Sequence, residues 1–248
     1  MTSNHFLVKA KNLQPPYALL EDEEHHHLSR VLRRGPGERV WLLDEQGNSY
    51  QAEVTEVGQR LTRLILLDKK KTPRARLRLV LAQALLKSKN MELVIQKATE
   101  LGAEVVIPIQ AARSIVRLGE KETAKLERWR KIIREAAKQS RRSNIPTLQP
   151  PQPLPHFLGA RDEPKKLILC EKGGVLLREM LAAGPGLPQG GKPSAVAILV
   201  GPEGGWTGEE EEQAVGSGFE AVSLGDRILR SETAALAVLA AISVFWGV

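Results

Sequence analysis

Two glycine-containing turns carry the residue types from which a small-molecule site is built. Gly201–Thr207 (GPEGGWT) directly follows the apolar run Ala195–Val200 (AVAILV), and Leu224–Arg227 (LGDR) ends a second short β-prone run. Ligands of open α/β sheets bind beyond the carboxyl ends of the strands, where glycine lets the backbone approach a ligand closely. The two turns therefore predict one small-molecule pocket at the ends of adjacent strands.

A phosphate-binding loop is the competing interpretation. Gly186–Lys192 (GLPQGGK) has the glycine and lysine spacing of a nucleoside triphosphate loop. However, Pro193 stands where Ser or Thr must bind magnesium, and a predicted strand follows where a helix is required. No G-x-G-x-x-G sequence links a strand to a helix, which excludes a dinucleotide fingerprint as well.

The elements that must position the two turns alternate between strand and helix after residue 73. Near-continuous apolar runs predict buried strands, and apolar residues at helical spacing predict amphipathic helices. The predicted strands cover residues 77–85, 105–109, 166–170, 195–200 and 221–224. The predicted helices cover residues 90–101 and 120–140 and a final apolar helix from residue 233, with loops at 150–155 and 184–193. This order predicts an α/β fold with a largely parallel sheet. Thr207 and Glu210 predict a capping box for a helix after the first turn.

The segment before residue 73 has a different pattern, made mainly of strands and turns. Short β-prone runs at 38–43, 49–57 and 60–67, with a helix around 23–31, predict a small β-barrel. The polar segment 69–73 (KKKTP) predicts a linker. The predicted domains are therefore residues 1–72 and residues 73–248.

Positive charge is concentrated in one part of the chain. The net charge is +7, and residues 113–142 hold 11 basic and 4 acidic side chains, so the rest of the chain is neutral in sum. Such a basic surface is typical of a protein that binds a polyanion. Three consecutive histidines, residues 25–27, cannot all face one ion on a helix, and we expect no metal site there.

The sequence predicts a cytoplasmic location for the protein. Its single cysteine, Cys170, excludes an internal disulfide and suits a reducing compartment. The first nine residues do not resemble a signal peptide, and the longest uncharged apolar run, residues 233–248, is shorter than a membrane helix of about 20 residues.

Five segments together resemble the bacterial 16S ribosomal RNA uracil-N3 methyltransferases, a family of the SPOUT (trefoil-knot) superfamily. LVGPEGGWT (199–207) and LGDRILRSETA (224–234) look like the paired cofactor motifs of that family. Residues 87–108 and 135–146 resemble its helix–strand segment and the end of its basic helix, and residues 25–54 resemble its N-terminal RNA-binding barrel. The departures, His5 for the more frequent Arg and Glu38 for the usual Asp, lie outside the cofactor motifs.

The resemblance implies a fold, a cofactor and partners. The fold is α/β, a parallel-sheet SPOUT domain with a deep trefoil knot, preceded by a small PUA-like β-barrel domain. The cofactor is S-adenosyl-L-methionine, and the substrate is 16S ribosomal RNA or the small ribosomal subunit, bound by a homodimer. The cofactor-binding residues carried over are Leu199, Gly201, Glu203, Gly204, Leu224, Gly225, Ile228 and Leu229.

Methylation at uracil N3 sets the chemistry that the neighbouring charged residues must perform. The base must be unpaired, and its N3 proton must leave. Arg227 and Arg230 are candidates to stabilise the uracil anion or to hold a phosphate, and Glu232 and Glu203 are candidate proton acceptors. The alternatives are that Glu232 only favours the first turn of the last helix through its dipole, and that Glu203 only hydrogen-bonds backbone.

RNA binding and subunit contact are assigned to other parts of the chain. Arg141 and Arg142 are candidates to bind RNA phosphates, as are Arg30, Arg33 and Arg34 in the small domain, with solvated surface charge as the alternative for each. The final helix is apolar all round, which requires burial within the subunit or against a partner, and the resemblance favours a dimer interface. The competing function is a non-catalytic RNA-binding or ribosome-assembly factor on a methyltransferase fold.

Overall fold

The chain forms two compact units. The structure, a computed structural model, describes residues 5–44, 48–71, 77–117, 119, 122–142, 144–183 and 193–247. One unit consists of Met1–Arg74 together with Arg134–Ile145, and the other of Ala75–Ile133 together with Pro146–Val248. The C-terminal end of the basic helix thus belongs with the N-terminal unit, which a division of the sequence at residue 72 did not anticipate.

The N-terminal unit is built on a six-stranded sheet. Its strands are β1 (His5–Val8), β2 (Leu13–Gln14), β3 (Tyr17–Glu21), β4 (Arg39–Asp44), β5 (Asn48–Val57) and β6 (Leu61–Lys71). Their order is β1-β4-β5-β6-β3-β2, antiparallel except for the parallel pair β1–β4. Alternate residues such as Ala18, Leu20 and Leu64 form the core on one face, as a period of two requires. The three predicted strands are confirmed, whereas the short strands β1 to β3 went unpredicted.

The helix predicted around residues 23–31 is confirmed, and its Leu28 belongs to that core. It consists of α1 (Asp22–His26), which continues as the π-helical turn η2 (His27–Val31), and a 3-10 turn, η1 (Ala10–Asn12), precedes β2. His25 is buried, with Nδ1 2.8 Å from the Thr62 hydroxyl and Nε2 3.3 Å from the Gln59 carbonyl. His25 therefore serves to fasten α1 to the sheet.

The second unit contains the predicted parallel sheet. Its strands are β7 (Arg78–Ala84), β8 (Ala103–Gln110), β9 (Thr147–Leu148), β10 (Gln152–Pro153), β11 (Lys165–Leu169), β12 (Val175–Leu176), β13 (Ala195–Val200) and β14 (Glu220–Ser223). The order is β10-β8-β7-β13-β11-β14-β12, with β9 also paired to β8, and every pair is parallel. The central strands are buried on both faces, which explains their uninterrupted apolar sequences.

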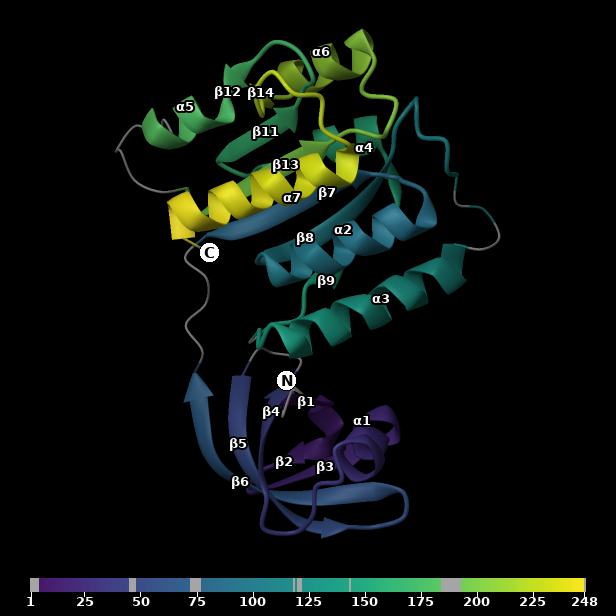
Figure 1. Cartoon of the computed structure of the whole chain (residues 1–248), viewed down its shortest axis with the longest axis vertical. Coiled ribbons are helices and arrows are strands. Elements are labelled where there is room, and N and C mark those ends of the chain that lie inside the picture. The colour runs from purple at the N-terminus through teal and green to yellow at the C-terminus, as the bar shows by residue number, and fades with distance from the viewer. Residues whose placement is uncertain are drawn as a thin grey trace. The chain divides into compact units, whose positions relative to one another are not determined.

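Helices cover both faces of this sheet. The helices of this unit are α2 (Ser88–Glu100), α4 (Leu154–Gly159), α5 (Leu177–Ala183), α6 (Gly208–Gly216) and α7 (Ser231–Ile242), which ends in a π-helical turn, η3 (Ser243–Gly247). Helix α3 (Glu122–Gln139) is divided between the two units. Helices α2 and α7 lie side by side on one face (Figure 1). Phe157 of α4 and Ala214 of α6 belong to the core cluster on the other face, with alternate residues of β7, β8 and β13.

The two predicted loops of this unit, residues 150–155 and 184–193, have different outcomes. Residues 150–155 were expected to be a loop, but Gln152–Pro153 pairs with β8 and α4 begins at Leu154, because Leu154, Phe157 and Leu158 reach the core at helical spacing. Residues 184–192, most of the second predicted loop, lie outside the described residues. Within the described residues, no helix is long and apolar enough to cross a membrane.

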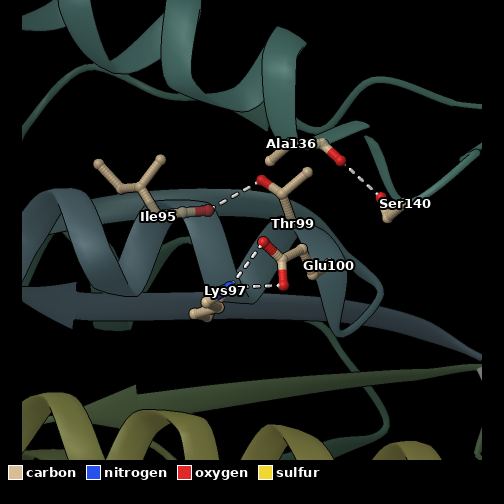
Figure 2. A network of polar contacts seen from close by, with 6 residues as sticks. All are labelled: Ile95, Lys97, Thr99, Glu100, Ala136 and Ser140. Carbon is tan, nitrogen blue, oxygen red and sulfur yellow. Dashed lines mark hydrogen bonds and ion pairs between the residues drawn. The ribbon is translucent and has the colours of Figure 1, made fainter. Parts of the chain in front are cut away.

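Helix α2 shows why its sequence predicts a helix so clearly. Met91, Val94, Ile95 and Ala98 form its buried face. The Thr99 hydroxyl donates to the Ile95 carbonyl at 2.8 Å, and the Lys97 ammonium lies 2.8 Å from a Glu100 carboxylate oxygen (Figure 2). Thr99 thus satisfies its buried hydroxyl within the helix, which costs less than leaving it without a partner.

One basic residue of α3 is buried. Lys138 is 5% exposed and forms ion pairs with Glu24 of α1 and with Glu135. Burial lowers the pKa of Lys138, but the charges and hydrogen bonds of Glu24 and Glu135 outweigh it, so that the pKa is raised. Lys138 therefore joins two elements of the N-terminal unit and is not placed to bind RNA.

Candidate active site

The two glycine turns lie at the same edge of the parallel sheet. The first follows β13, whose last residue, Val200, pairs with Gln83 near the end of β7. The second follows β14, which pairs with β11. The turns were expected at adjacent strand ends, but β11 lies between β13 and β14. The sequence order of the strands carries no information on this insertion, because parallel strands are connected by crossovers.

Gly201 is fastened through its carbonyl oxygen. Ser231, the first residue of α7, donates its hydroxyl to this oxygen, and the Gln83 amide nitrogen lies 3.4 Å from it. The same amide donates to the Ser231 hydroxyl at 3.0 Å and to the Ala84 carbonyl at 3.1 Å. Gln83 is fully buried, and its own amide oxygen has no partner in the described part of the chain. The ends of β7 and β13 and the start of α7 are thus tied together at one point.

Gly201 also requires the absence of a side chain. A Cβ atom at this position would lie 3.1 Å from the Trp206 indole ring. The ring is held in place because its Nε1 donates to the Leu169 carbonyl at 3.1 Å. The first turn therefore folds back over its own glycine and is anchored to the end of β11.

Two further residues hold the rest of the first turn. Arg113 donates to the carbonyl oxygens of Gly204 and Trp206 at 3.1 Å and 3.0 Å. The predicted capping box is confirmed, with Glu210 N–H donating to the Thr207 hydroxyl at 3.2 Å and Thr207 N–H donating to the Glu210 carboxylate at 2.9 Å. The other Glu210 oxygen accepts from Ala112 N–H at 2.8 Å. The turn is consequently rigid before any ligand binds.

The second turn forms far fewer hydrogen bonds with the rest of the described chain. Gly225 has φ +111°, which only glycine adopts readily, and its N–H donates to the Ser223 hydroxyl at 3.2 Å. The peptide groups of residues 226–229 form no hydrogen bond within the part of the chain that the structure describes. The Ile228 side chain is 74% exposed. A stretch of free peptide groups beside an exposed apolar side chain is suited to hold a flat, polar-edged ligand.

The charged candidates fall into two groups. Arg227 and Arg230 are exposed, and neither forms an ion pair within the described residues. Glu232 is 8% exposed, lies in the first turn of α7, and has one buried carboxylate oxygen without a hydrogen-bond partner in that part of the chain. Glu203 is exposed, and among the described residues its carboxylate accepts only from Lys87 N–H, at 3.4 Å. Of these two acidic residues, Glu232 is therefore the one whose carboxylate is left with an oxygen to which a ligand can donate a hydrogen bond.

The remaining cofactor candidates occupy distinct positions. Leu199 is fully buried in β13, so its side chain belongs to the core and only its backbone can face a ligand. Leu224 and Leu229 are half-buried in the second turn, and Gly204 is exposed in the first.

The arginine candidates of the small domain are not equivalent. Arg30 and Arg33 are exposed, and Arg33 has φ +51°. Arg34 is half-buried and forms an ion pair with Glu38. The hydrogen bonds from Arg34 and from Gly35 N–H lower the pKa of Glu38. Arg34 therefore closes its own loop, and the other two arginines are the better placed to contact RNA.

Arg141 and Arg142 end the basic helix in the same unit. Arg141 is exposed with φ +56°, and after burial its positive charge is the second cause that lowers the pKa of His5. Arg142 donates to the Asn144 side-chain oxygen at 3.0 Å. The ion pair between Lys138 and Glu24 joins this helix end to α1, which leads directly into Arg30. Both arginine groups thus stand on elements that contact each other.

Sequence reasoning missed four residues that shape the site: Gln83, Arg113, Trp206 and Ser231. The signal for Gln83 was present, because a single polar residue inside the apolar run 77–85 must find hydrogen bonds when buried. Arg113 carries no such signal, because its partners are backbone groups about ninety residues away.

Comparison with known proteins identifies the kind of site. An RNA methyltransferase domain model matches residues 73–243, and an RNA methyltransferase PUA domain model matches residues 20–62. The ribosomal RNA small subunit methyltransferase E of Bacillus subtilis is 33% identical over 239 residues, which cover 96% of this chain and 93% of that protein. The protein of the same name from Synechocystis is 34% identical over 221 residues, which cover 88% of this chain and 70% of that protein.

Solved structures agree over the whole chain. The ribosomal RNA small subunit methyltransferase E of Neisseria gonorrhoeae, bound to S-adenosyl methionine, is 32% identical with a TM-score of 0.85, over 98% of this chain and 97% of that one. A putative methyltransferase of Legionella pneumophila, in complex with the same cofactor, is 31% identical with a TM-score of 0.86, over 98% of both chains. The α/β fold class is confirmed, with a PUA-like half-barrel sheet before a parallel-sheet RNA methyltransferase domain, while membership of the SPOUT superfamily and the knot stay predictions. This chain belongs to the family of the ribosomal RNA small subunit methyltransferases E.

Proposed function

We propose that the protein transfers a methyl group from S-adenosyl-L-methionine to N3 of the uridine at position 1498 of 16S ribosomal RNA. The observation that carries this proposal is the second glycine turn, whose peptide groups at residues 226–229 have no partners in the described chain. Because these peptide groups are mostly exposed and not engaged within the described chain, they are open to hydrogen bonds with a ligand. The solved relatives from Neisseria and Legionella are described with this cofactor bound, which supports the assignment.

The residues of the two turns fit this cofactor. Backbone of Leu224, Gly225, Ile228 and Leu229 would pair the adenine edges, with the exposed Ile228 side chain against its face. The rigid first turn, Gly201 to Gly204, would form the other wall, and Glu203 would face the polar end of the ligand. When bound, S-adenosylmethionine supplies a methyl group activated by the sulfonium.

The chain's own task is to present uracil N3 and to take its proton. A nitrogen on the pairing edge is accessible only in an unpaired base. Glu232, whose buried carboxylate oxygen has no donor, would accept the N3 proton. Arg227 and Arg230 would stabilise the negative charge that develops on the uracil oxygens or hold a neighbouring phosphate, since neither is engaged in an ion pair within the described residues.

RNA backbone would be held in the N-terminal unit. Arg30, Arg33 and Arg141 are exposed. Arg30 and Arg33 lie on and just after η2, and Arg141 follows α3, whose end the Lys138–Glu24 ion pair joins to α1. Arg142 and Arg34 would contribute less, because Asn144 and Glu38 already engage them. Contacts of this type position the RNA without reading its sequence.

We further propose that the protein acts as a homodimer, in the cytoplasm where small ribosomal subunits assemble. One side of α7 is buried in the protomer, but the chain beyond it leaves Val244 80% and Phe245 57% exposed. Two large apolar side chains exposed in sequence at the end of an apolar helix favour cover by a second copy.

Methyl transfer to ribosomal subunits tests the function. Labelled S-adenosylmethionine, the protein and small subunits from cells that lack this activity are incubated, and the modified nucleotide is mapped by mass spectrometry. Label at N3 of the proposed uridine is expected. Transfer to another nucleotide would overturn the site, and cofactor binding without transfer to any ribosomal RNA would overturn the substrate. Absence of both binding and transfer would favour a non-catalytic assembly factor.

A further inference from the structure

A pocket lies on the outer face of the N-terminal sheet. Ala18 and Leu20 of β3 point into the core, so Tyr17 and Leu19 point to the opposite face. Arg63 of β6 pairs with Leu19 in register and shares that face. The pocket has a volume of about 340 Å³ and is lined by Lys11, Asn12, Gln14, Tyr17, Ala18, Leu19, Thr55 and Arg63.

Three lining side chains are uncommitted. Lys11, Gln14 and Tyr17 form no side-chain hydrogen bond, ion pair or ring contact with any residue that the structure describes. Tyr17 is 60% exposed, although an aromatic residue on a strand ordinarily packs against cross-strand neighbours. Its ring and hydroxyl are therefore available to a ligand.

The charge of the pocket selects an anionic ligand. Lys11 and Arg63 are its charged lining residues, and no acidic side chain lines it. Arg63 pairs with Glu56 at the surface, where both side chains are more than half exposed, at 56% and 55%. Exposed pairs of this kind contribute little stability, so Arg63 can exchange its carboxylate for a phosphate.

We propose that this pocket binds one unpaired nucleotide of the RNA substrate. The base stacks on the Tyr17 ring, Gln14 contacts the base edge, and Lys11 and Arg63 hold the flanking phosphates. An exposed aromatic ring in a pocket that is also lined by cations is the combination by which proteins bind single-stranded nucleic acid. A volume near the lower end of ligand pockets suits one nucleotide and excludes a duplex.

This subsite includes no residue of the glycine turns and none of the arginine candidates 30, 33, 34, 141 and 142. It rests on the proposed function only in taking RNA as the substrate. It would give the N-terminal unit a means to recognise an unpaired strand beside the modified base. The arginines alone would bind any phosphate backbone.

Stacking is tested with ring variants of the full-length protein. Fluorescence anisotropy measures binding of a labelled single-stranded RNA octamer and of the same octamer in a duplex. Tyr17→Leu is expected to weaken single-strand binding roughly tenfold, whereas Tyr17→Phe, which keeps the ring, retains it. Equal affinity in both variants, or an equal loss for the duplex, would overturn the proposal. The exposed position of Tyr17 keeps both variants folded, and their melting temperatures verify this.

The phosphate contact is tested with a charge-matched control. Lys11→Gln and Lys9→Gln remove the same charge two positions apart, but Lys9 forms an ion pair with Asp22 at 3.1 Å and does not line the pocket. Lys11→Gln is expected to reduce the salt dependence of single-strand binding by about 0.7 in the log–log slope, and Lys9→Gln to leave it unchanged. The same reduction in both variants would show a general charge effect and contradict the subsite.

Methyl transfer separates failure of the subsite from failure of the function. If Tyr17→Leu binds the octamer as well as the natural chain does, and subunits are still methylated, the subsite is wrong and the function stands. If the natural chain binds no single-stranded RNA, the subsite is overturned, and the subunit assay alone decides the function.

Discussion

At the scale of single residues, Glu232 stands apart from the other acidic side chains near the turns. It is buried, and one oxygen has no partner among the described residues. By contrast, Glu203 is exposed, and both Glu210 oxygens accept hydrogen bonds, one in the capping box and one from Ala112 N–H. Leaving a buried carboxylate oxygen unpaired is costly, and such groups are retained at functional sites.

Glu232→Gln is expected to slow methyl transfer by about 100-fold or more, because the amide cannot accept the N3 proton. Cofactor affinity should change little. Single-turnover transfer to unmethylated small subunits measures the rate, and calorimetry measures cofactor binding. Glu212→Gln, at an exposed position of α6, is the matched control, with a nearly natural rate expected. A natural rate in Glu232→Gln would assign this residue to helix stabilisation alone.

Cys170 makes stability depend on pH in the alkaline range. Burial, then the charge and hydrogen bond of Glu211, raise the pKa of its thiol from 9.0 to about 12. The folded state therefore keeps the proton between these values while the unfolded chain releases it. Because the unfolded chain binds fewer protons there, the free energy of unfolding falls as pH rises.

Cys170→Ala is expected to flatten this fall by up to about 1.4 kcal/mol per pH unit above pH 9. Urea denaturation at a series of alkaline pH values measures the slope. Tyr50, whose pKa is also raised to about 12, is unchanged in both proteins and cancels in the comparison. Parallel slopes for the two proteins would show that the thiol is not protected.

At the scale of elements, Gln83 couples β7, β13 and α7. Its amide reaches Ser231, Gly201 and Ala84, so the position of the first glycine turn relative to α7 depends on one buried side chain. We therefore predict that Gln83 acts as a positioning residue, through the Gly201 carbonyl and the Ser231 hydroxyl.

Gln83→Leu is expected to weaken cofactor binding about tenfold, because the Ser231 hydroxyl and the Gly201 carbonyl lose a buried donor. Thr99→Val is the control. It lies on α2 of the same unit and removes the buried hydrogen bond from the Thr99 hydroxyl to the Ile95 carbonyl (Figure 2). Both variants should lose stability, but only Gln83→Leu should lose affinity. Calorimetry measures the affinity and thermal unfolding the stability. Equal affinities in the two variants would refute the positioning role.

At the scale of the whole molecule, the final helix serves the protomer and the proposed dimer through different residues. Leu239 is fully buried within the protomer, while Phe245 is 57% exposed. A charge at the first position damages the core, and a charge at the second damages only an interface with a second copy.

Leu239→Asp is therefore expected to unfold the chain, and Phe245→Asp to yield a folded monomer. Analytical ultracentrifugation measures the association state, and circular dichroism measures folding. Val215→Asp, at a position 51% exposed on α6, controls for a charge elsewhere on the surface. A dimer that persists in Phe245→Asp would place the interface on another surface.

The sequence by itself predicted the longer strands and helices and the two glycine turns, but not the short elements β1 to β3, β10 and α4. Strands such as 195–200 and helices such as 90–101 follow from periodicity, because burial on one or both faces leaves a regular apolar pattern. The glycines of both turns and the capping box at Thr207 are local signals and needed no knowledge of the rest of the chain.

Only the tertiary structure decided which residues meet. The insertion of β11 between β13 and β14, the bonds of Gln83 to Ser231 and of Arg113 to Gly204, and the burial of Lys138 against Glu24 all join segments distant in sequence. The unpaired peptide groups of 226–229 and the pocket beside Tyr17 are likewise absent from any sequence pattern. Local patterns record whether a residue is buried, but they do not record its partner, because parallel strands and their crossovers bring together residues whose spacing along the chain carries no signal.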